Sequence, residues 1–284
     1  LGLVGSEMCI RDRMNTFSDN QDYEADMFVN NHEAKEIMDD NTLLVVVDTN
    51  KPSITQCEDL LYMAKMIVVL DHHRQGSDTI RNSVLSYIEP YASSASEMVA
   101  EILQYFTEGI RIRNVEADSI YAGIMIDTDN FMQKTGVRTF EAAAFLRRCG
   151  ADVTRVRKLF REDMNDYKAR GETIRNAELF RGQFAISECP SDYVDSPTVV
   201  GAQAANELLN IVGVKASFVL TEYKGVIYIS ARAIDEVNVQ IIMERMGGGG
   251  HLNMAGCQLE TVDLEGARSL LKSTLTEMQD GGEI

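Results

Sequence analysis

The sequence predicts an α/β protein with two domains, in which a largely parallel sheet domain is joined by a helix to a smaller α/β domain. Short apolar runs alternate with helical stretches in the first half of the chain, as they do in β/α units. Residues 153–180 are rich in Arg, Glu and Lys at helical spacing, which suits a linker helix. The alternation then resumes, so we expect domains at residues 14–152 and 181–284.

In the first domain, apolar runs at residues 43–47 and 66–70 predict buried strands. Helices are expected at residues 57–64, 94–106 and 139–148. Residues 117–127 complete the β/α pattern, and the apolar run at residues 123–126 is expected to be a further strand of the sheet.

The second domain is expected to mix strands and helices. Strands are predicted near residues 184–187, 216–221 and 226–231, and helices near residues 199–209, 237–246 and 264–278. The first thirteen residues fit neither domain. We interpret residues 1–13 as an artefactual tail that looks like a translated sequencing adapter.

Composition limits the functional classes. The chain has 284 residues, of which 45% are hydrophobic, and its formal net charge is −17. Such acidity argues against nonspecific binding of duplex nucleic acid, although a small phosphate ligand held by metal ions or local cations is compatible with it. The five cysteines have no paired spacing and are interpreted as reduced, mostly buried cytosolic thiols. No apolar run approaches the roughly 20 residues that a membrane span needs.

Three apolar runs each end in a candidate metal ligand. Asp48 follows the first run, Asp71 and His72 follow the second, and Asp127 follows the third. Because the carboxyl ends of parallel strands meet at one edge of a sheet, we expect these side chains to converge. Carboxylates with neutral imidazole suit Mn²⁺ or Mg²⁺ better than structural zinc.

Each residue also has an ordinary structural interpretation. Asp48 or Asp127 at the end of an element is often only a turn former or a helix cap. His32 lies in a polar stretch and is interpreted as a surface residue, and Cys257 as a core residue. The repetition of apolar run and then ligand favours the metal site.

A glycine run precedes the last histidine of the chain. Gly247, Gly248, Gly249 and Gly250 lead directly into His251. Glycines let backbone N–H groups approach an anion, so we interpret the run as a phosphate cradle with His251 as a donor. A hinge or a helix C-cap is the alternative. Arg232, just past a predicted strand, is expected to add a cation to the same pocket, unless it is an ordinary surface arginine.

These motifs resemble the DHH/DHHA1 phosphoesterase family from about residue 43 onward. The resemblance is carried by VDTN at residues 47–50, DHH at 71–73, GIMIDT at 123–128 and GGGGH at 247–251. More narrowly, YIEPYASSASE at 87–97, KTGVRTFEAA at 134–143 and NVQIIME at 238–244 are similar to the membrane-anchored cyclic-di-AMP phosphodiesterases.

The resemblance implies a DHH-type parallel-sheet domain, a smaller DHHA1 substrate-binding domain and a site for two Mn²⁺ ions, with Mg²⁺ or Co²⁺ as alternatives. Asp48, His72 and Asp127 are the implied metal ligands, and His73 is implied to lie beside the substrate phosphate. Arg232 and residues 247–251 are implied to bind the nucleotide. The implied reaction opens cyclic di-AMP to linear 5′-pApA with a metal-activated water. A homodimer and a full-length protein anchored in the membrane, with this part in the cytosol, are also compatible with the resemblance.

The chain departs from the family pattern at its first motif. No His is followed by Asp at both the fourth and the sixth positions, a pattern that supplies about half of the metal ligands in the family. We therefore expect an incomplete metal site, in a chain truncated at its N-terminus, and weak or absent turnover. Three other functions stay open: an oligoribonuclease or 3′-phosphoadenosine-5′-phosphate phosphatase of the same family, a noncatalytic nucleotide-binding regulator, and, ranked last, an inorganic pyrophosphatase.

Overall fold

The computed structural model describes residues 14, 17, 18, 20, 22–24, 26–106, 109 and 111–284. They form two compact units that divide between Arg161 and Glu162. The tail predicted at residues 1–13 lies outside the described residues. Within the described part of the chain, no helix combines the length and the apolarity that a membrane span requires.

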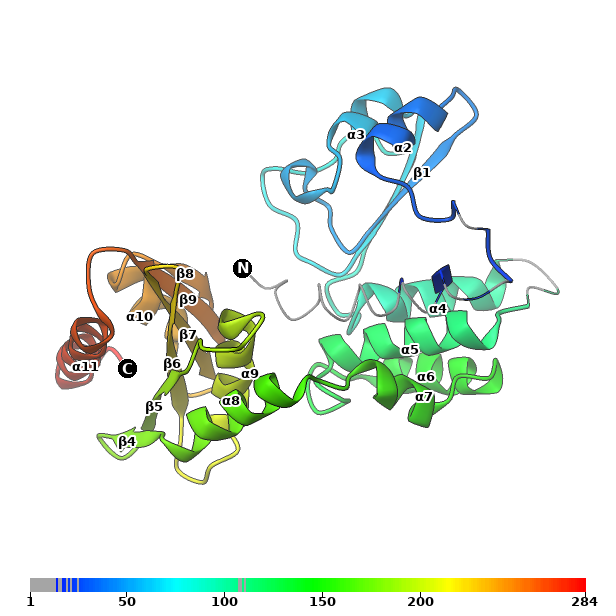
Figure 1. Ribbon diagram of the computed structural model, residues 1–284. Helices are drawn as coiled ribbons and strands as arrows, with labels where there is room; N and C mark the ends of the chain where they lie inside the picture. The colour runs from blue at the N-terminus through cyan, green and yellow to red at the C-terminus, as the bar shows by residue number, and fades with distance from the viewer. Residues whose placement is uncertain are drawn as a thin grey trace. The chain divides into compact units, whose positions relative to one another are not determined.

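The first unit contains a three-stranded parallel sheet with strand order β1-β2-β3 (Figure 1). The strands are β1 (Leu43–Val47), β2 (Met66–Asp71) and β3 (Leu85–Ile88). Val47 of β1 pairs with Leu70 of β2, so these two strands end side by side. Both strands are predicted by their runs of Val, Ile and Leu, which favour extended structure. The expected burial holds for β2 but is wrong for β1, which lies at the edge of the sheet and leaves Leu43, Val45 and Val47 about half exposed.

Helices make up the rest of this unit. The sheet is accompanied by the short elements α2 (Asn31–Ile37), η1 (Pro52–Ile54) and α3 (Asp59–Met63). The other helices are α4 (Ala95–Tyr105), α5 (Asn114–Asp127), α6 (Val137–Arg148) and α7 (Val153–Leu159). Helices α4, α5, α6 and α7 share a core rich in alanine, and the small alanine side chain lets these helices pack closely.

The strand predicted at residues 123–126 is wrong, because these residues belong to α5. Glu116 caps the start of that helix by accepting a hydrogen bond from the backbone N–H of Arg113. Ala117, Tyr121 and Ile124 are buried at helical spacing. The apolar run is therefore the end of a 14-residue helix, and Asp127 is its last residue.

The single linker helix predicted at residues 153–180 is also wrong. Helix α7 ends at Leu159, and α8 (Met164–Arg175) begins after Asp163, whose side chain accepts a hydrogen bond from the backbone N–H of Asn165. The last residues of the segment form β4 (Glu178–Phe180). The N-cap at Asp163, which starts α8, is the reason that residues 153–180 do not form one continuous helix.

The second unit is built on a six-stranded mixed sheet of order β4-β5-β6-β7-β9-β8 (Figure 1). Its other strands are β5 (Phe184–Cys189), β6 (Ala216–Tyr223), β7 (Val226–Ala233), β8 (Gly249–His251) and β9 (Met254–Leu259). Besides α8, the described residues of this unit form the helices α9 (Pro197–Leu208), α10 (Val239–Arg245) and α11 (Leu264–Asp280).

The two faces of this sheet are covered by different helices. Helices α10 and α11 pack with Phe184, Phe218 and Ile229 in the main core. Helix α9 packs with Ala185 and Val219, whose side chains point the opposite way. Strand β7 alternates between the two faces, so Arg232 points to the side opposite the main core.

Candidate metal and nucleotide-binding site

Asp48 and His72 meet at the ends of β1 and β2. The backbone N–H of Asp48 donates to the carbonyl of Leu70 at 3.0 Å, which continues the strand pairing by one residue. Asp48 then turns with φ of 64°, a left-handed conformation that aspartate tolerates better than most residues. Its Oδ1 lies 3.3 Å from Nε2 of His72. The predicted convergence of these two residues is therefore present in the structure.

His72 is held on two sides. Its side chain is only 12% exposed, and the ring also hydrogen-bonds the backbone of Ala92. Burial lowers the pKa of His72, but the hydrogen bond with Asp48 and the negative charges of Asp127 and Asp48 outweigh burial and raise it above its ordinary value. An imidazole oriented in this way has one nitrogen facing the carboxylates, as a metal ligand does.

Asp71 orients the second histidine of the motif. Its side chain is fully buried, and its Oδ1 lies 2.7 Å from Nδ1 of His73. Asn50 donates to the other carboxylate oxygen. Burial raises the pKa of Asp71, but the hydrogen bonds from His73 and Asn50 outweigh burial and lower it. The side chain of His73 is 58% exposed, so its Nε2 is free to meet a ligand.

Asp127, at the end of helix α5, lies near enough to interact electrostatically with Asp48, His72 and His73, but its carboxylate is outside the group whose ligand atoms lie within 4.8 Å of one another. Asp127 is exposed at the surface, but desolvation by the surrounding protein and repulsion by Asp48 raise its pKa, while the positive charges of His72 and Lys134 offset part of the shift. The structure thus brings Asp127 near the predicted partners, although the element that carries it was wrongly predicted. Lys134 belongs to the loop after α5, where Asp129, Asn130, Phe131 and Lys134 all have positive φ.

These side chains form a donor set suited to a hard divalent cation. Ligand atoms of Asp48, His72 and His73 lie within 4.8 Å of one another, and no other such group occurs among the residues that the structure describes. Oxygen and imidazole nitrogen donors without thiolate suit Mn²⁺ or Mg²⁺. Crowded negative charge, seen in the raised pKa of Asp127, is the electrostatic condition that a cation relieves.

The glycine run in the second unit has a structural explanation for part of its length. The N–H groups of Gly247 and Gly248 donate to the carbonyls of Glu244 and Met243, which makes a Schellman cap at the end of α10. A Cβ on Gly248 would lie 2.2 Å from the carbonyl oxygen of Gly256. Two of the four N–H groups are therefore already bonded, and only those of Gly249 and Gly250 remain for a phosphate or for β9.

Arg232 and His251 share one face of the second sheet. Met254 of β9 pairs with Arg232 on one side and with His251 on the other, so the three side chains point the same way. Nε of Arg232 is buried without a hydrogen-bond partner. Burial lowers the pKa of Arg232 to about 10. An uncompensated, partly buried guanidinium beside an exposed histidine favours an anionic ligand.

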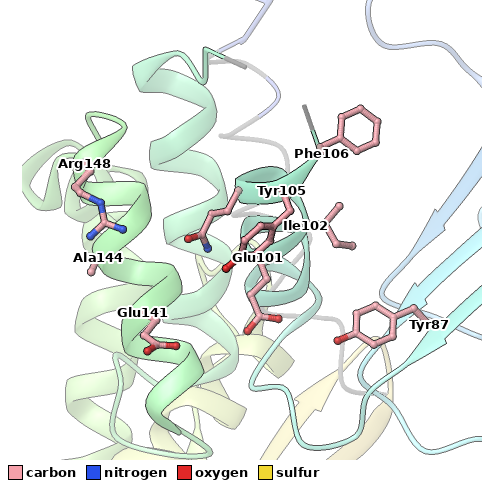
Figure 2. A pocket seen from close by; sticks show the side chains of 9 residues that line it. Tyr87, Glu101, Ile102, Tyr105, Phe106, Glu141, Ala144 and Arg148 are labelled. Atoms are coloured by element: carbon pink, nitrogen blue, oxygen red, sulfur yellow. The ribbon is translucent and has the colours of Figure 1, made fainter. Parts of the chain in front are cut away.

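A groove elsewhere in the first unit is not part of this site. It has a volume of about 940 Å³ and lies along α4 and α6 (Figure 2). Its lining residues are Tyr87, Glu101, Ile102, Gln104, Tyr105, Phe106, Glu141, Ala144 and Arg148. None of the candidate ligands lines it, so volume alone does not locate the chemistry.

Three contributors to the site were not singled out in the sequence, Asn50, Ala92 and Lys134, and Asp71 was singled out as a candidate metal ligand rather than as the partner of His73. Asn50 and Asp71 lie within the recognised motifs but act by orienting His73. Ala92 acts through its backbone, for which a side-chain pattern gives no signal. Lys134 lies in a motif noted in the sequence, but its approach to Asp127 depends on the fold of the intervening loop.

The family models match both units. The DHH family N-terminal domain matches residues 4–124, and the DHHA1 domain matches residues 184–277. The chain belongs to the DHH/DHHA1 family. The first match covers the Asp-His-His motif, and the second covers Arg232 and the glycine run.

Two curated relatives extend this comparison. The chain is 43% identical over 259 residues to the cyclic-di-AMP phosphodiesterase GdpP of Bacillus subtilis, covering 90% of this chain and 39% of that protein. It is 37% identical over 256 residues to a membrane protein–large ribosomal subunit bL9 fusion protein of Aster yellows witches'-broom phytoplasma, covering 90% of this chain and 30% of that protein. The chain thus spans less than half of each relative.

A solved structure supports the fold. An exopolyphosphatase-related protein from Bacteroides fragilis matches with a TM-score of 0.77 and 20% sequence identity, covering 98% of this chain and 88% of that one. At this identity the likeness concerns the fold alone. The α/β architecture predicted from the sequence is confirmed.

Proposed function

We propose that this chain is a phosphodiesterase that hydrolyses cyclic di-AMP to linear 5′-pApA with Mn²⁺ as its cofactor. The observation that carries the proposal is the group formed by Asp48, His72 and His73, which lies in a DHH domain. The relative from Bacillus subtilis, named a cyclic-di-AMP phosphodiesterase, supports the choice of substrate.

Asp48, His72 and Asp127 would hold the metal, and the donor set fits it. Their carboxylate oxygens and imidazole nitrogen are the atoms that Mn²⁺ and Mg²⁺ accept, and repulsion between Asp48 and Asp127 favours a cation between them. When bound, such a cation lowers the pKa of water and polarises the phosphoryl group.

His73 is assigned to the substrate phosphate. Its Nδ1 is occupied by Asp71, so a phosphate can reach only Nε2. In its protonated form the ring donates from Nε2 to a phosphoryl oxygen, and Asp71 keeps the ring oriented. The reaction breaks one P–O3′ bond, the oxygen of water ends on phosphorus, and a proton goes to the departing 3′ oxygen.

The second unit is assigned to nucleotide binding. Arg232 and His251 lie on one face of the sheet and would bind an anionic group together. Arginine is suited to a phosphate because its planar donors match two oxygens at once. Gly249, two residues before His251, has open space where a Cβ would stand and so leaves room for a close approach of the ligand to the backbone, whereas the bare Cα of Gly250 is filled by β9.

We further propose that the whole protein is anchored in a membrane, with this part in the cytosol. The name of the phytoplasma relative, a membrane protein fusion, supports this proposal. Fractionation of cells that express the full-length gene, followed by immunodetection, tests it. Recovery of the whole protein in the soluble fraction would contradict the anchor.

The activity is tested with the purified chain, Mn²⁺ and cyclic di-AMP, with products separated by ion-exchange chromatography. Because the sequence lacks the His and two Asp of the first family motif, we expect slow formation of 5′-pApA. A parallel measurement of Mn²⁺ binding by electron paramagnetic resonance does not depend on turnover. We expect the chain to bind Mn²⁺, and Asp48→Asn to weaken binding at least tenfold.

Comparison substrates separate the alternatives. Faster cleavage of linear pApA or of 3′-phosphoadenosine 5′-phosphate would replace the proposal with an oligoribonuclease or phosphatase. Tight binding of cyclic di-AMP without any product would favour a noncatalytic regulator. Absence of both Mn²⁺ binding and nucleotide binding would overturn the proposed function as a whole.

A further inference from the structure

Tyr91 has an aromatic side chain that is almost fully exposed to solvent. It is 93% exposed and lies in the loop of residues 89–94, between β3 and α4. Burial of a tyrosine side chain normally contributes stability, so a ring so fully exposed contributes little to this fold.

The loop that carries Tyr91 is well fixed, so the exposure does not come from a loose segment. The N–H of Glu89 donates to the carbonyl of Asp71 at 2.9 Å, and the N–H of Ala92 donates to the carbonyl of Glu89 at 3.0 Å. Ala92 is 5% exposed, and Ser94 is fully buried and caps α4 by accepting from the N–H of Glu97. The backbone on both sides of Tyr91 is thus anchored, and only its side chain is free.

Tyr91 also lies beside the candidate metal ligands. The backbone of its neighbour Ala92 hydrogen-bonds the ring of His72. Consecutive Cα atoms are about 3.8 Å apart, so the ring of Tyr91 begins one residue away from this contact. The exposed ring of Tyr91 is therefore a candidate contact for the base of a nucleotide whose phosphate lies at His72 and His73.

We propose that Tyr91 is a positioning residue that stacks on an adenine base of the dinucleotide while the adjoining phosphate lies at His72 and His73. This inference rests on the proposed function and adds a base-binding contact to it. Every base has a π-face that an aromatic ring can cover, and such a contact strengthens binding roughly tenfold or more per base. A ring on a fixed loop binds a base with little loss of conformational freedom.

The chain contains no tryptophan, which permits a direct optical test. The variant Tyr91→Trp places a single indole at the proposed contact, and stacking on adenine is expected to quench its fluorescence. Tyr105→Trp is the matched control. Tyr105 is 86% exposed and lies at the far end of the 11-residue helix α4, which is about 16 Å long. Linear 5′-pApA is added with Mg²⁺, since paramagnetic Mn²⁺ itself quenches fluorescence.

We expect saturable quenching in Tyr91→Trp and none in Tyr105→Trp. By calorimetry, Tyr91→Phe should bind 5′-pApA like the unsubstituted chain, and Tyr91→Ala should bind it about tenfold more weakly. Binding of inorganic phosphate, which has no base, should be equal in all of these variants. Loss of phosphate binding in Tyr91→Ala would show damage to the site and overturn the stacking role.

The outcomes distinguish this inference from the function on which it rests. If the unsubstituted chain binds 5′-pApA but Tyr91→Ala binds it equally well and Tyr91→Trp is not quenched, the stacking role is wrong and the proposed function stands. If the unsubstituted chain binds neither 5′-pApA nor cyclic di-AMP, the proposed function fails, and the inference fails with it.

Discussion

Arg232 on β7 and His251 on β8 occupy one cross-strand row, because both pair with Met254 of the intervening strand β9. Neighbouring strands lie about 4.8 Å apart, so the two backbones are separated by about 10 Å. This is a distance across which a long arginine side chain and an imidazole can contact the same small anion. The pairing of β8 with β9 therefore places His251, at the end of the glycine run, in the same row as Arg232.

Arg232 is expected to be unfavourable for stability and favourable for binding. Replacing it with methionine removes a partly buried charge that has no counterion, so Arg232→Met should raise the free energy of unfolding by about 1 kcal/mol or more. The same variant should bind 5′-pApA at least tenfold more weakly. Chemical denaturation and calorimetry measure the two effects.

The stability difference should also depend on pH. Burial lowers the pKa of Arg232 to about 10 in the folded protein, below its ordinary value, so between these two pKa values the unfolded chain binds more protons. The free energy of unfolding of the unsubstituted chain therefore rises with pH as Arg232 loses its proton. The difference in free energy of unfolding between Arg232→Met and the unsubstituted chain should shrink above about pH 10. An advantage that stays constant up to pH 11, or a variant less stable than the unsubstituted chain, would contradict the uncompensated charge.

The glycine run provides a second prediction with an internal control. Gly248→Ala places a Cβ within 2.2 Å of the carbonyl oxygen of Gly256, whereas a Cβ on Gly249 meets nothing within 4 Å. We expect Gly248→Ala to lower the free energy of unfolding by about 1–3 kcal/mol and Gly249→Ala to change it by less than about 0.5 kcal/mol. Equal effects of the two substitutions in urea denaturation would argue against the close approach of this segment to β9.

The elements that the sequence predicts well are runs of residues that favour extended structure. Strands β1 and β2 consist mostly of Val, Ile and Leu, Asp48 directly follows β1 and Asp71 ends β2, so both the strand and its chemical end were visible. Residues 123–126 are equally apolar but belong to a helix. A run of four apolar residues fits the two-residue period of a strand and the 3.6-residue period of a helix equally well. Only the whole of α5, with the buried Ala117 and Tyr121 at helical spacing, distinguishes the two.

The shared face of Arg232 and His251 was beyond a prediction from sequence. Strand β8 consists of Gly249, Gly250 and His251 and carries no β-propensity signal. Its pairing with β9 depends on a two-residue turn at Leu252 and Asn253 and on the absence of side chains at Gly248 and Gly250. Side-chain chemistry was readable in the sequence, whereas strand register was not.

Asp127 is expected to destabilise the metal-free protein and to stabilise the metal-bound one. Its pKa is raised by desolvation and by Asp48, so the ionised form is unfavourable in the folded state above the ordinary pKa of aspartate. At pH 7 in EDTA, Asp127→Asn should therefore melt at the same temperature as the unsubstituted chain or slightly higher. With Mn²⁺ the order should reverse, because the variant lacks one ligand and gains less from binding.

Differential scanning calorimetry with and without Mn²⁺ measures this reversal. Asp129→Asn is a suitable control, since Asp129 is an exposed carboxylate two residues away that is absent from the candidate ligands. It should show the same gain from Mn²⁺ as the unsubstituted chain. An equal gain in Asp127→Asn would remove Asp127 from the metal site.

The raised pKa of His72 can be measured in the metal-free protein and depends on Asp48. Burial alone lowers the pKa of this imidazole, and it is the hydrogen bond with Asp48 together with the charges of Asp127 and Asp48 that raise it. Asp48→Asn removes one full charge and the charge-assisted hydrogen bond while keeping the size of the side chain. We therefore expect the pKa of His72 to fall in this variant, toward or below its ordinary value. Titration of the histidine ring signals by NMR in EDTA resolves this, because the chain has only four histidines. A pKa of His72 that is unchanged in Asp48→Asn would mean that the 3.3 Å contact between the two side chains does not set the charge of the ring.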